Sequence, residues 1–158
     1  MAECPLCNDV GIQVTSAGDH AQARRCNCHD PCTRCHSSGY FFETDEFGYR
    51  LAIPCKCTQL DQRAQFYNDA QIPARYADAQ FSRVQAGGNG SDMANARRKA
   101  WRFAREYEPG VSGVLLHGSV GTGKTYLSAA VLRYLIINRG VRAKFTEFMH
   151  LLSDLRAS

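Results

Sequence analysis

The sequence predicts an α/β protein in two parts, a cysteine-rich segment of short hairpins and a later strand–loop–helix–strand–helix unit. Three observations predict this class. All eight cysteines lie between Cys4 and Cys57 and repeat one spacing. A glycine-rich loop, Gly118 to Thr125, separates a short apolar run from an apolar, helix-like segment. Between these two parts lie helical patterns divided by Pro and Gly. We therefore divide the chain into three segments, residues 1–58, 59–110 and 111–158.

The composition is that of a globular chain. Of the 158 residues 44 % are hydrophobic, which is too many for a disordered protein. No apolar run approaches the roughly 18 residues that span a bilayer, and the start lacks the pattern of a signal peptide. We therefore expect a soluble, cytoplasmic protein with no membrane contact. In such a protein, paired cysteines indicate metal sites more often than disulfides.

The cysteines form two copies of one CxxC…CxC pattern, and none is left over. The first copy is Cys4, Cys7, Cys26 and Cys28, and the second is Cys32, Cys35, Cys55 and Cys57. Four thiolates from two knuckles are the ligands of a closed, structural zinc site. A glycine follows each CxxC, at Gly11 and Gly39, where a turn into a strand begins. Each copy therefore predicts a zinc-ribbon-like hairpin, with two Zn²⁺ ions in all.

The knuckles can pair in two ways. They pair within each repeat, or outer with outer and inner with inner, as in the DnaJ zinc domain. Only three residues separate Cys28 from Cys32, which favours pairing within each repeat. Redox cysteines and an iron–sulfur centre are the competing interpretations, and the spacing with its repetition favours zinc.

Charge is distributed unevenly along the chain. Residues 1–58 hold five Lys and Arg against seven Asp and Glu, residues 59–110 hold eight against six, and residues 111–158 hold six against two. Four thiolates on each divalent zinc add a formal charge of about −2 per site, which opposes binding to a phosphate backbone. The cysteine segment is therefore predicted to dock a protein rather than a nucleic acid.

The middle segment predicts two helices. Residues 58–71 have a helical pattern, which Ile72-Pro73 ends. The glycine-rich stretch 87–90 then forms a short connection, and Ser91 or Asp92 caps a second helix.

The second helix runs to about Tyr107, and Pro109-Gly110 breaks it. One face carries a predicted buried stripe, which consists of Met93, Ala96, Ala100, Phe103, Ala104 and Tyr107. Another face carries Arg98, Arg102 and Arg105. We interpret it as a solvated face, with a DNA or phosphate contact as the alternative.

The loop from Gly118 to Thr125 is a complete G-x-x-x-x-G-K-[ST] motif. A strand-like run at 114–117 precedes it, and an apolar helix over 126–138 follows, with Gly140 as its stop. This order of elements predicts an ATP site. The phosphates lie against the backbone N–H groups of the loop, formed by Gly118, Ser119, Val120, Gly121, Thr122 and Gly123. Lys124 reaches the β- and γ-phosphates, and the Thr125 hydroxyl ligates Mg²⁺.

Beyond the phosphate loop the sequence predicts one more strand and one more helix. Residues 141–145 form the strand, and Thr146 caps the helix. The helix carries an apolar set of Phe148, Leu151, Leu152 and Leu155.

The segment from residue 111 resembles the AAA+ module of the DnaC/DnaI-type bacterial helicase loaders and of their IstB transposition relatives. The stretch 72–81 is similar to that family's lead-in, so the resemblance covers 72–158. It implies an ATPase of DNA replication whose N-terminal zinc domain docks on the replicative helicase and whose AAA+ module contacts single-stranded DNA. A transposition helper, a P-loop kinase, and a zinc-domain adaptor with an inert P-loop are the alternatives.

The resemblance also implies motifs that this sequence lacks. Ser119-Val120 stand where the family usually has Pro-Pro, and no Walker B strand, sensor or arginine finger follows. In an AAA+ sheet later strands lie between the first two, so 114–117 and 141–145 would leave a gap. We therefore expect an incomplete AAA+ domain without catalytic residues, which does not hydrolyse ATP alone.

Overall fold

A computed structural model describes residues 4–29, 31–84, 90–110 and 113–157. These residues form two separate antiparallel two-stranded sheets and four α-helices. The strands are β1 (Ile12–Ala17), β2 (His20–Arg25), β3 (Tyr40–Thr44) and β4 (Arg50–Pro54). The helices are α1 (Lys56–Asp69), α2 (Gly90–Glu106), α3 (Lys124–Arg139) and α4 (Phe148–Ala157). Short 3-10 turns occupy Asn27–His29, Ala74–Tyr76 and Phe81–Arg83.

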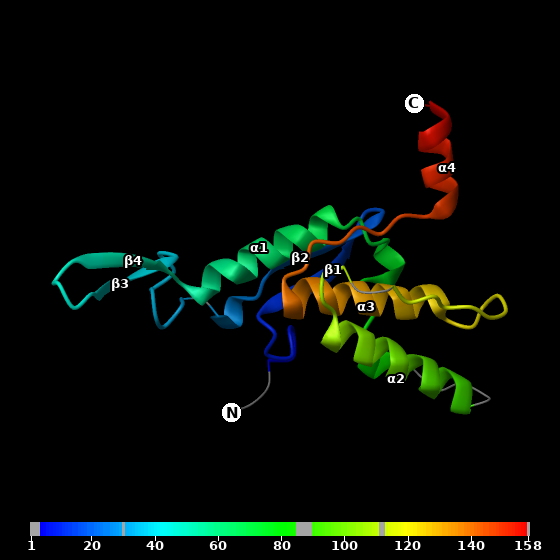
Figure 1. Cartoon of the computed structure of the whole chain (residues 1–158), viewed down its shortest axis with the longest axis horizontal. Coiled ribbons are helices and arrows are strands. Elements are labelled where there is room, and N and C mark those ends of the chain that lie inside the picture. Colours follow the sequence, from blue (N-terminus) through cyan, green and yellow to red (C-terminus); the bar gives the residue numbers. More distant parts are fainter. Residues whose placement is uncertain (1–3, 30, 85–89, 111–112, 158) are drawn as a thin grey trace.

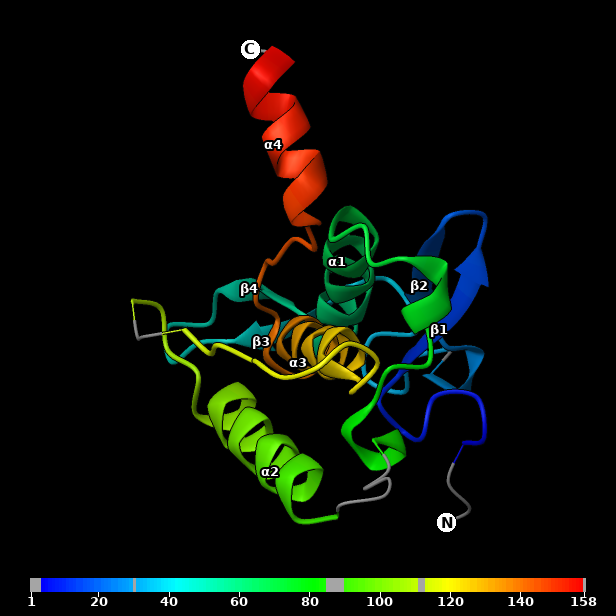
Figure 2. The same ribbon diagram turned by 90° about the vertical axis from the view of Figure 1, so that its right-hand side faces the viewer.

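Helix α3 crosses the middle of the molecule (Figure 1). Figure 2 looks along this helix and shows α1 on one side of it and α2 on another. Hairpin β1–β2 lies close to α1, whereas hairpin β3–β4 and helix α4 project from the body in two directions (Figures 1 and 2). The helix that follows the phosphate loop is therefore the element around which the rest is arranged.

Each cysteine repeat contains the predicted hairpin. β1 pairs with β2, and β3 pairs with β4, both antiparallel. The glycines before the two hairpins, Gly11 and Gly39, have φ values of 79° and 84°. Side chains of L-residues rarely adopt such angles, so both turns depend on glycine.

The predicted helices are present, with small differences at their ends. α1 begins at Lys56, two residues before the predicted start, and ends before Ile72-Pro73. α2 begins at Gly90, so a cap at Ser91 or Asp92 is wrong, since both lie inside the helix. The rest of the predicted glycine-rich connection, 87–89, lies outside the described residues. α4 begins at Phe148, so the cap predicted at Thr146 is wrong, since Thr146 stands two residues before the helix.

The strands predicted at 114–117 and 141–145 are absent from the structure, so this prediction is wrong. Neither segment belongs to a sheet, and both run as plain trace beside α3 in Figure 2. A strand exists through hydrogen bonds to a neighbouring strand. Among the described residues no strand lies beside either segment, so their apolar pattern has no partner to pair with.

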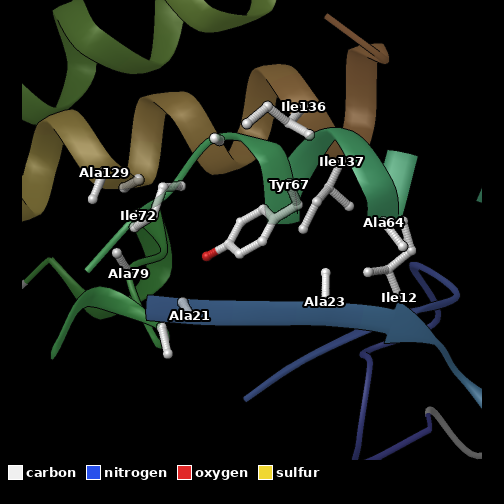
Figure 3. Packing of buried hydrophobic residues seen from close by; sticks show 13 residues of the cluster. Ile12, Ala21, Ala23, Ala64, Tyr67, Ile72, Ala79, Ala129, Ile136 and Ile137 are labelled. Carbon is white, nitrogen blue, oxygen red and sulfur yellow. The ribbon is translucent and has the colours of Figure 1, made fainter. Parts of the chain in front are cut away.

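The main core lies between β1–β2, α1 and α3. Figure 3 shows the ring of Tyr67, which is 0 % exposed, between strand β2 and helix α3. The buried residues of this cluster are Ile12, Ala21, Ala23, Ala64, Tyr67, Ala70, Ile72, Ala77, Ala79, Ala129, Ala130, Ile136 and Ile137. They come from all three predicted segments, so the core crosses the expected boundaries at 58 and 110.

The outer edge of β2 is closed by side-chain and backbone bonds from the next part of the chain. The Ala21 N–H donates to the Ile72 carbonyl at 2.8 Å. The Asn68 side chain accepts from the Ala23 N–H at 2.6 Å and donates to the Ala23 carbonyl at 3.1 Å. These bonds hold the first hairpin on α1 and on the segment that leads to α2.

A second cluster joins α2 to α3. The predicted stripe of α2 is confirmed, because Ala100 and Ala104 are 0 % exposed and its larger members pack around them. The facing residues of α3 are Leu127, Val131 and Leu135. The three arginines predicted on the solvated face, Arg98, Arg102 and Arg105, are exposed.

Within the part of the chain that the structure describes, no helix is both long and apolar enough to cross a membrane.

Candidate nucleotide and metal sites

The phosphate loop turns on glycines at its predicted positions. Gly121 and Gly123 have φ values of 82° and 77°, and Gly118 has 144°. Helix α3 begins at Lys124, directly after Gly123. The loop therefore ends at the N-terminus of a 16-residue helix. At this end the free N–H groups and the helix dipole favour binding of an anion.

The Lys124 ammonium lies inside the turn of its own loop. Its Nζ is 3.1 Å from the carbonyl oxygen of Gly118, 2.7 Å from that of Ser119 and 3.3 Å from Thr122 Oγ1. The Thr122 hydroxyl in turn donates to the Ser119 carbonyl at 2.9 Å. The charge is thus held where the phosphates of a nucleotide would meet the loop.

A hollow of about 570 Å³ opens beside the start of α3. Thr125, the predicted magnesium ligand, lines it together with Lys124. Arg75 and Lys144 contribute two further cations, and Glu147 contributes a carboxylate that pairs with Arg75 at 3.1 Å. The surplus of positive charge suits a polyphosphate, and Glu147 is an oxygen donor of the type that Mg²⁺ prefers.

Sequence reasoning missed Arg75 and Lys144. They stand far from the phosphate loop in sequence and belong to no motif, so no local signal marks them. The fold brings them to the hollow, because the Phe145 N–H donates to the Ala70 carbonyl at 2.8 Å. That bond holds the segment before α4 against the end of α1.

Two further segments support the loop. The Tyr126 hydroxyl, on the first turn of α3, donates to the Asp78 carbonyl at 3.0 Å. Met93 of α2 lies so close that a Cβ built on Gly123 would be 3.4 Å from its methyl carbon. Asp78, which precedes α2, and Met93, near its start, therefore pack beside the phosphate loop and the first turn of α3.

The eight cysteines gather in two groups of four, one for each repeat. The sulfur atoms within each group lie within 4.8 Å of one another. Pairing within each repeat, the favoured prediction, is thus the arrangement found. The groups are Cys4, Cys7, Cys26 and Cys28, and Cys32, Cys35, Cys55 and Cys57.

The sulfur spacings fit a metal better than a disulfide. In the first group Cys4 and Cys26 are 3.9 Å apart and Cys7 and Cys28 are 3.4 Å apart, measured between Sγ atoms. The corresponding pairs of the second group are 3.7 and 3.3 Å apart. A tetrahedron with Zn–S bonds of about 2.3 Å has sulfur atoms about 3.8 Å apart, whereas a disulfide needs about 2.05 Å.

The two knuckles share one hydrogen-bond pattern. The N–H four residues after the first cysteine donates back to its carbonyl, at 2.8 Å in the first repeat and 2.7 Å in the second. The first cysteine of the CxC pair donates its N–H to the carbonyl of Gly11 or Gly39, at 2.9 and 2.8 Å. The repeated spacing in the sequence is therefore repeated in the backbone geometry.

Thiol acidity differs within each group. Backbone N–H groups of Leu6 and Cys7 lower the pKa of the Cys4 thiol to about 7. Desolvation raises the pKa of Cys35, but hydrogen bonds from Cys57, Gly39 and Cys55 outweigh it and lower that pKa to about 6. The Cys35 hydrogen bond and desolvation raise the pKa of Cys57 to about 12. A divalent metal would displace the remaining protons of each group.

The loop sequence and its place directly before α3 are those of a P-loop, and the two four-cysteine groups could hold zinc. The family model of the AFG1-like ATPases matches residues 56–156. The chain belongs to this family. Searches of curated proteins and of solved structures found no match to this chain.

Proposed function

We propose that the chain binds ATP with Mg²⁺ at Gly118–Thr125 and holds one zinc ion in each cysteine group. The observation that carries the nucleotide site is the Lys124 ammonium, held within 3.1 Å of two loop carbonyls at the start of α3. In this arrangement Lys124 neutralises the β- and γ-phosphates, the loop N–H groups bind their oxygens, and Thr125 ligates the magnesium ion.

The nucleotide site is tested by titrating the full chain with a fluorescent ATP analogue in the presence of Mg²⁺. Lys124→Ala should remove binding, and Thr125→Ala should weaken it only when Mg²⁺ is present. Lys99→Ala, an exposed lysine on α2, is the matched control and should bind normally. Equal affinities for wild type and Lys124→Ala would contradict the assignment.

The zinc sites are tested by metal analysis of the purified chain. About two zinc ions per chain are expected from four thiolates per ion. The variants Cys26→Ser and Cys55→Ser should each lose one ion and retain the other. A chain that holds iron, or one ion shared between the repeats, would overturn this arrangement.

At a finer level we propose that this ATPase acts in DNA replication as a helicase loader. Its partners are the replicative helicase, bound by the cysteine segment, and single-stranded DNA, bound by the ATPase module. Hairpin β3–β4 supports the first contact, because Phe47 and Tyr49 at its tip are 78 % and 70 % exposed. Exposed aromatic side chains of this kind gather at protein interfaces.

The helicase contact is tested by binding the full chain to an immobilised replicative helicase hexamer. The double variant Phe47→Ser, Tyr49→Ser should lose the interaction while it keeps ATP binding. Met149→Ser, an exposed residue of α4 outside the phosphate loop, is a control for removal of exposed apolar surface. Undiminished binding of the double variant would place the helicase contact elsewhere or exclude it.

A further inference from the structure

A second cavity, of about 730 Å³, lies away from the phosphate loop. Residues of the first cysteine knuckle, the 3-10 turn Phe81–Arg83, helix α2 and helix α3 line it. On α3 it touches Arg133, Tyr134 and Ile137, which by helical spacing face the opposite side from Thr125 and Ser128. Its volume is in the range of ligand sites, about 300–1,000 Å³, and the nucleotide site does not use it.

Three aromatic rings form one wall of the cavity. The ring centroids of Trp101 and Tyr134 are 4.8 Å apart, and those of Phe81 and Trp101 are 5.1 Å apart, both edge-on. Trp101 keeps 38 % of its surface exposed despite these contacts. Leu6 and Val10 of the first knuckle also line the cavity and are 61 % and 37 % exposed. The cavity therefore offers exposed aromatic and apolar surface to a planar ligand.

The charged groups of the lining have one sign. Arg97, Arg98 and Arg133 line the cavity, and the described lining residues include no carboxylate. Arg97 donates to the Val84 carbonyl at 3.2 Å and Arg98 to the Asn95 side chain at 2.7 Å. Each guanidinium carries five N–H donors, so these bonds leave donors for a ligand.

Helix α2 continues this positive charge beyond the cavity. Arg98, Arg102 and Arg105 are exposed and follow one another at helical spacing, with Trp101 among them. Arg105 is partly neutralised by Glu106 at 3.0 Å. Arg98 and Arg102 lie about 6 Å apart along the helix axis, which is close to the separation of neighbouring phosphates on an extended strand.

We propose that this cavity binds one base of a single-stranded nucleic acid, with the base stacked on Trp101 and the flanking phosphates on Arg98 and Arg102. Aromatic rings beside a row of cations are the features with which proteins bind single strands. Duplex DNA does not suit this mode, because its bases are stacked on one another inside the helix and are not free to stack on Trp101. The inference rests on the proposed nucleic-acid partner and supplies its site.

The thiolates of the first cysteine group are compatible with this orientation. Cys7 lines the cavity but is only 7 % exposed, and its neighbours Leu6 and Val10 cover the knuckle side with apolar surface. The uncharged base lies between Trp101 and the apolar surface of the knuckle, and the phosphates lie along α2 at Arg98 and Arg102. The negative charge of a zinc–thiolate group is thereby kept from the phosphate backbone.

Trp101 is the single tryptophan of the chain, so its fluorescence reports on the site directly. The full chain is titrated with oligo(dT) and oligo(U) of about 15 nucleotides at low salt. A stacked base should quench the Trp101 emission in a saturable way. Duplex DNA of the same length should quench it much less. Absence of quenching with oligonucleotide bound, or absence of oligonucleotide binding, would overturn the proposal.

Variants separate this site from other surfaces. Trp101→Ala should weaken oligo(dT) binding about 5- to 150-fold, and Trp101→Phe should retain most of it. Arg98→Gln should lower the slope of log affinity against log salt by about 0.7, the value for one phosphate contact on a single strand. The matched controls are Tyr49→Ala and Arg50→Gln on hairpin β3–β4. Equal losses in these controls would place the strand on the hairpin and contradict the inference.

A parallel titration with the ATP analogue distinguishes this inference from the nucleotide assignment. Trp101→Ala should bind the analogue as wild type does, which also shows that the variant is folded. If the wild-type chain does not bind the analogue, the nucleotide assignment fails, whereas the oligonucleotide result still stands. If an acidic peptide, and not oligo(dT), quenches Trp101, the cavity is a protein-docking site and the nucleic-acid proposal fails.

Discussion

The two cysteine units share spacing, knuckle hydrogen bonds and glycine turns, yet they stand in different relations to the rest of the molecule. In the first, Ile12, Ala21 and Ala23 are at most 6 % exposed and belong to the main core with α1 and α3. In the second, Tyr40, Phe42 and Leu51 are 54 %, 60 % and 49 % exposed. The small side chains of β2 let α1 approach closely, whereas the rings of Tyr40 and Phe42 on β3 remain exposed.

The comparison teaches that one metal-binding pattern can serve two purposes in a single chain. The first unit is part of the scaffold that carries the helix of the phosphate loop. The second, which projects from the body in Figure 1, keeps its side chains available for contacts. Among the described residues its own core consists of three buried cysteines with Cys32 and Phe41 against them, so we expect a bound metal ion to stabilise this unit more than packing does.

The largest difference is expected from removal of the first zinc site. Cys26→Ser should cost on the order of 5 kcal/mol or more, because a structural zinc contributes about 10–16 kcal/mol in small metal-dependent units. Since β2 packs on α1 and the main core reaches α3, the loss should also abolish binding of the ATP analogue. Thermal unfolding and the analogue titration measure both effects, and unchanged analogue binding would show that the first unit is dispensable for α3.

Tyr67 offers a test of the packing without the metal. Tyr67→Ala should cost about 3–5 kcal/mol, because it leaves a large cavity between β2 and α3. Tyr67→Phe keeps the ring and should cost much less. Denaturant unfolding of both variants, with zinc content measured alongside, separates packing from metal binding. Similar costs for the two variants would mean that the hydroxyl, not the ring, supports the first unit.

Removal of the second zinc site should have a smaller and more local effect. Cys55→Ser should lose one zinc ion and the hydrogen-exchange protection of β3 and β4, while binding of the ATP analogue changes less than about twofold. Because Cys55 immediately precedes α1, the first turn of that helix should also fray. If the whole chain unfolds in this variant, the two cysteine units contribute equally to the stability of the chain, contrary to this expectation.

The smallest effect on stability is expected at the tip of the second hairpin. Phe47→Ser with Tyr49→Ser removes two exposed rings and should change the free energy of unfolding by no more than about 0.5 kcal/mol. The melting temperature checks this expectation. A large destabilisation would show that the rings pack on the chain in solution and are not free for a partner.

Much of the candidate site could be predicted because its signals are local. The spacing of the cysteines indicated both groups, and the loop sequence placed Lys124 just before the helix predicted over 126–138, although α3 begins at Lys124 itself. That Ile12 shares one core cluster with Ala129 and Ile136 of α3 could not be predicted, since these residues are more than a hundred positions apart. Arg75 and Lys144 join the nucleotide hollow for the same reason.

The wrong strands at 114–117 and 141–145 have a physical cause as well. An apolar run of four or five residues favours a strand only where another strand offers hydrogen bonds. Leu115 and Val114 illustrate this condition, because they are 87 % and 45 % exposed instead of buried in a sheet. Sequence periodicity indicates which residues suit a strand, but it does not indicate whether a partner strand is present.

Asn68 gives the first hairpin one further property. Its side-chain amide bonds both the N–H and the carbonyl of Ala23, at 2.6 and 3.1 Å, as a peptide group of a neighbouring strand would. A helix side chain thus imitates the next strand and terminates the sheet. The first hairpin is protected on that edge against strand addition by another chain, a route to aggregation that exposed edges leave open.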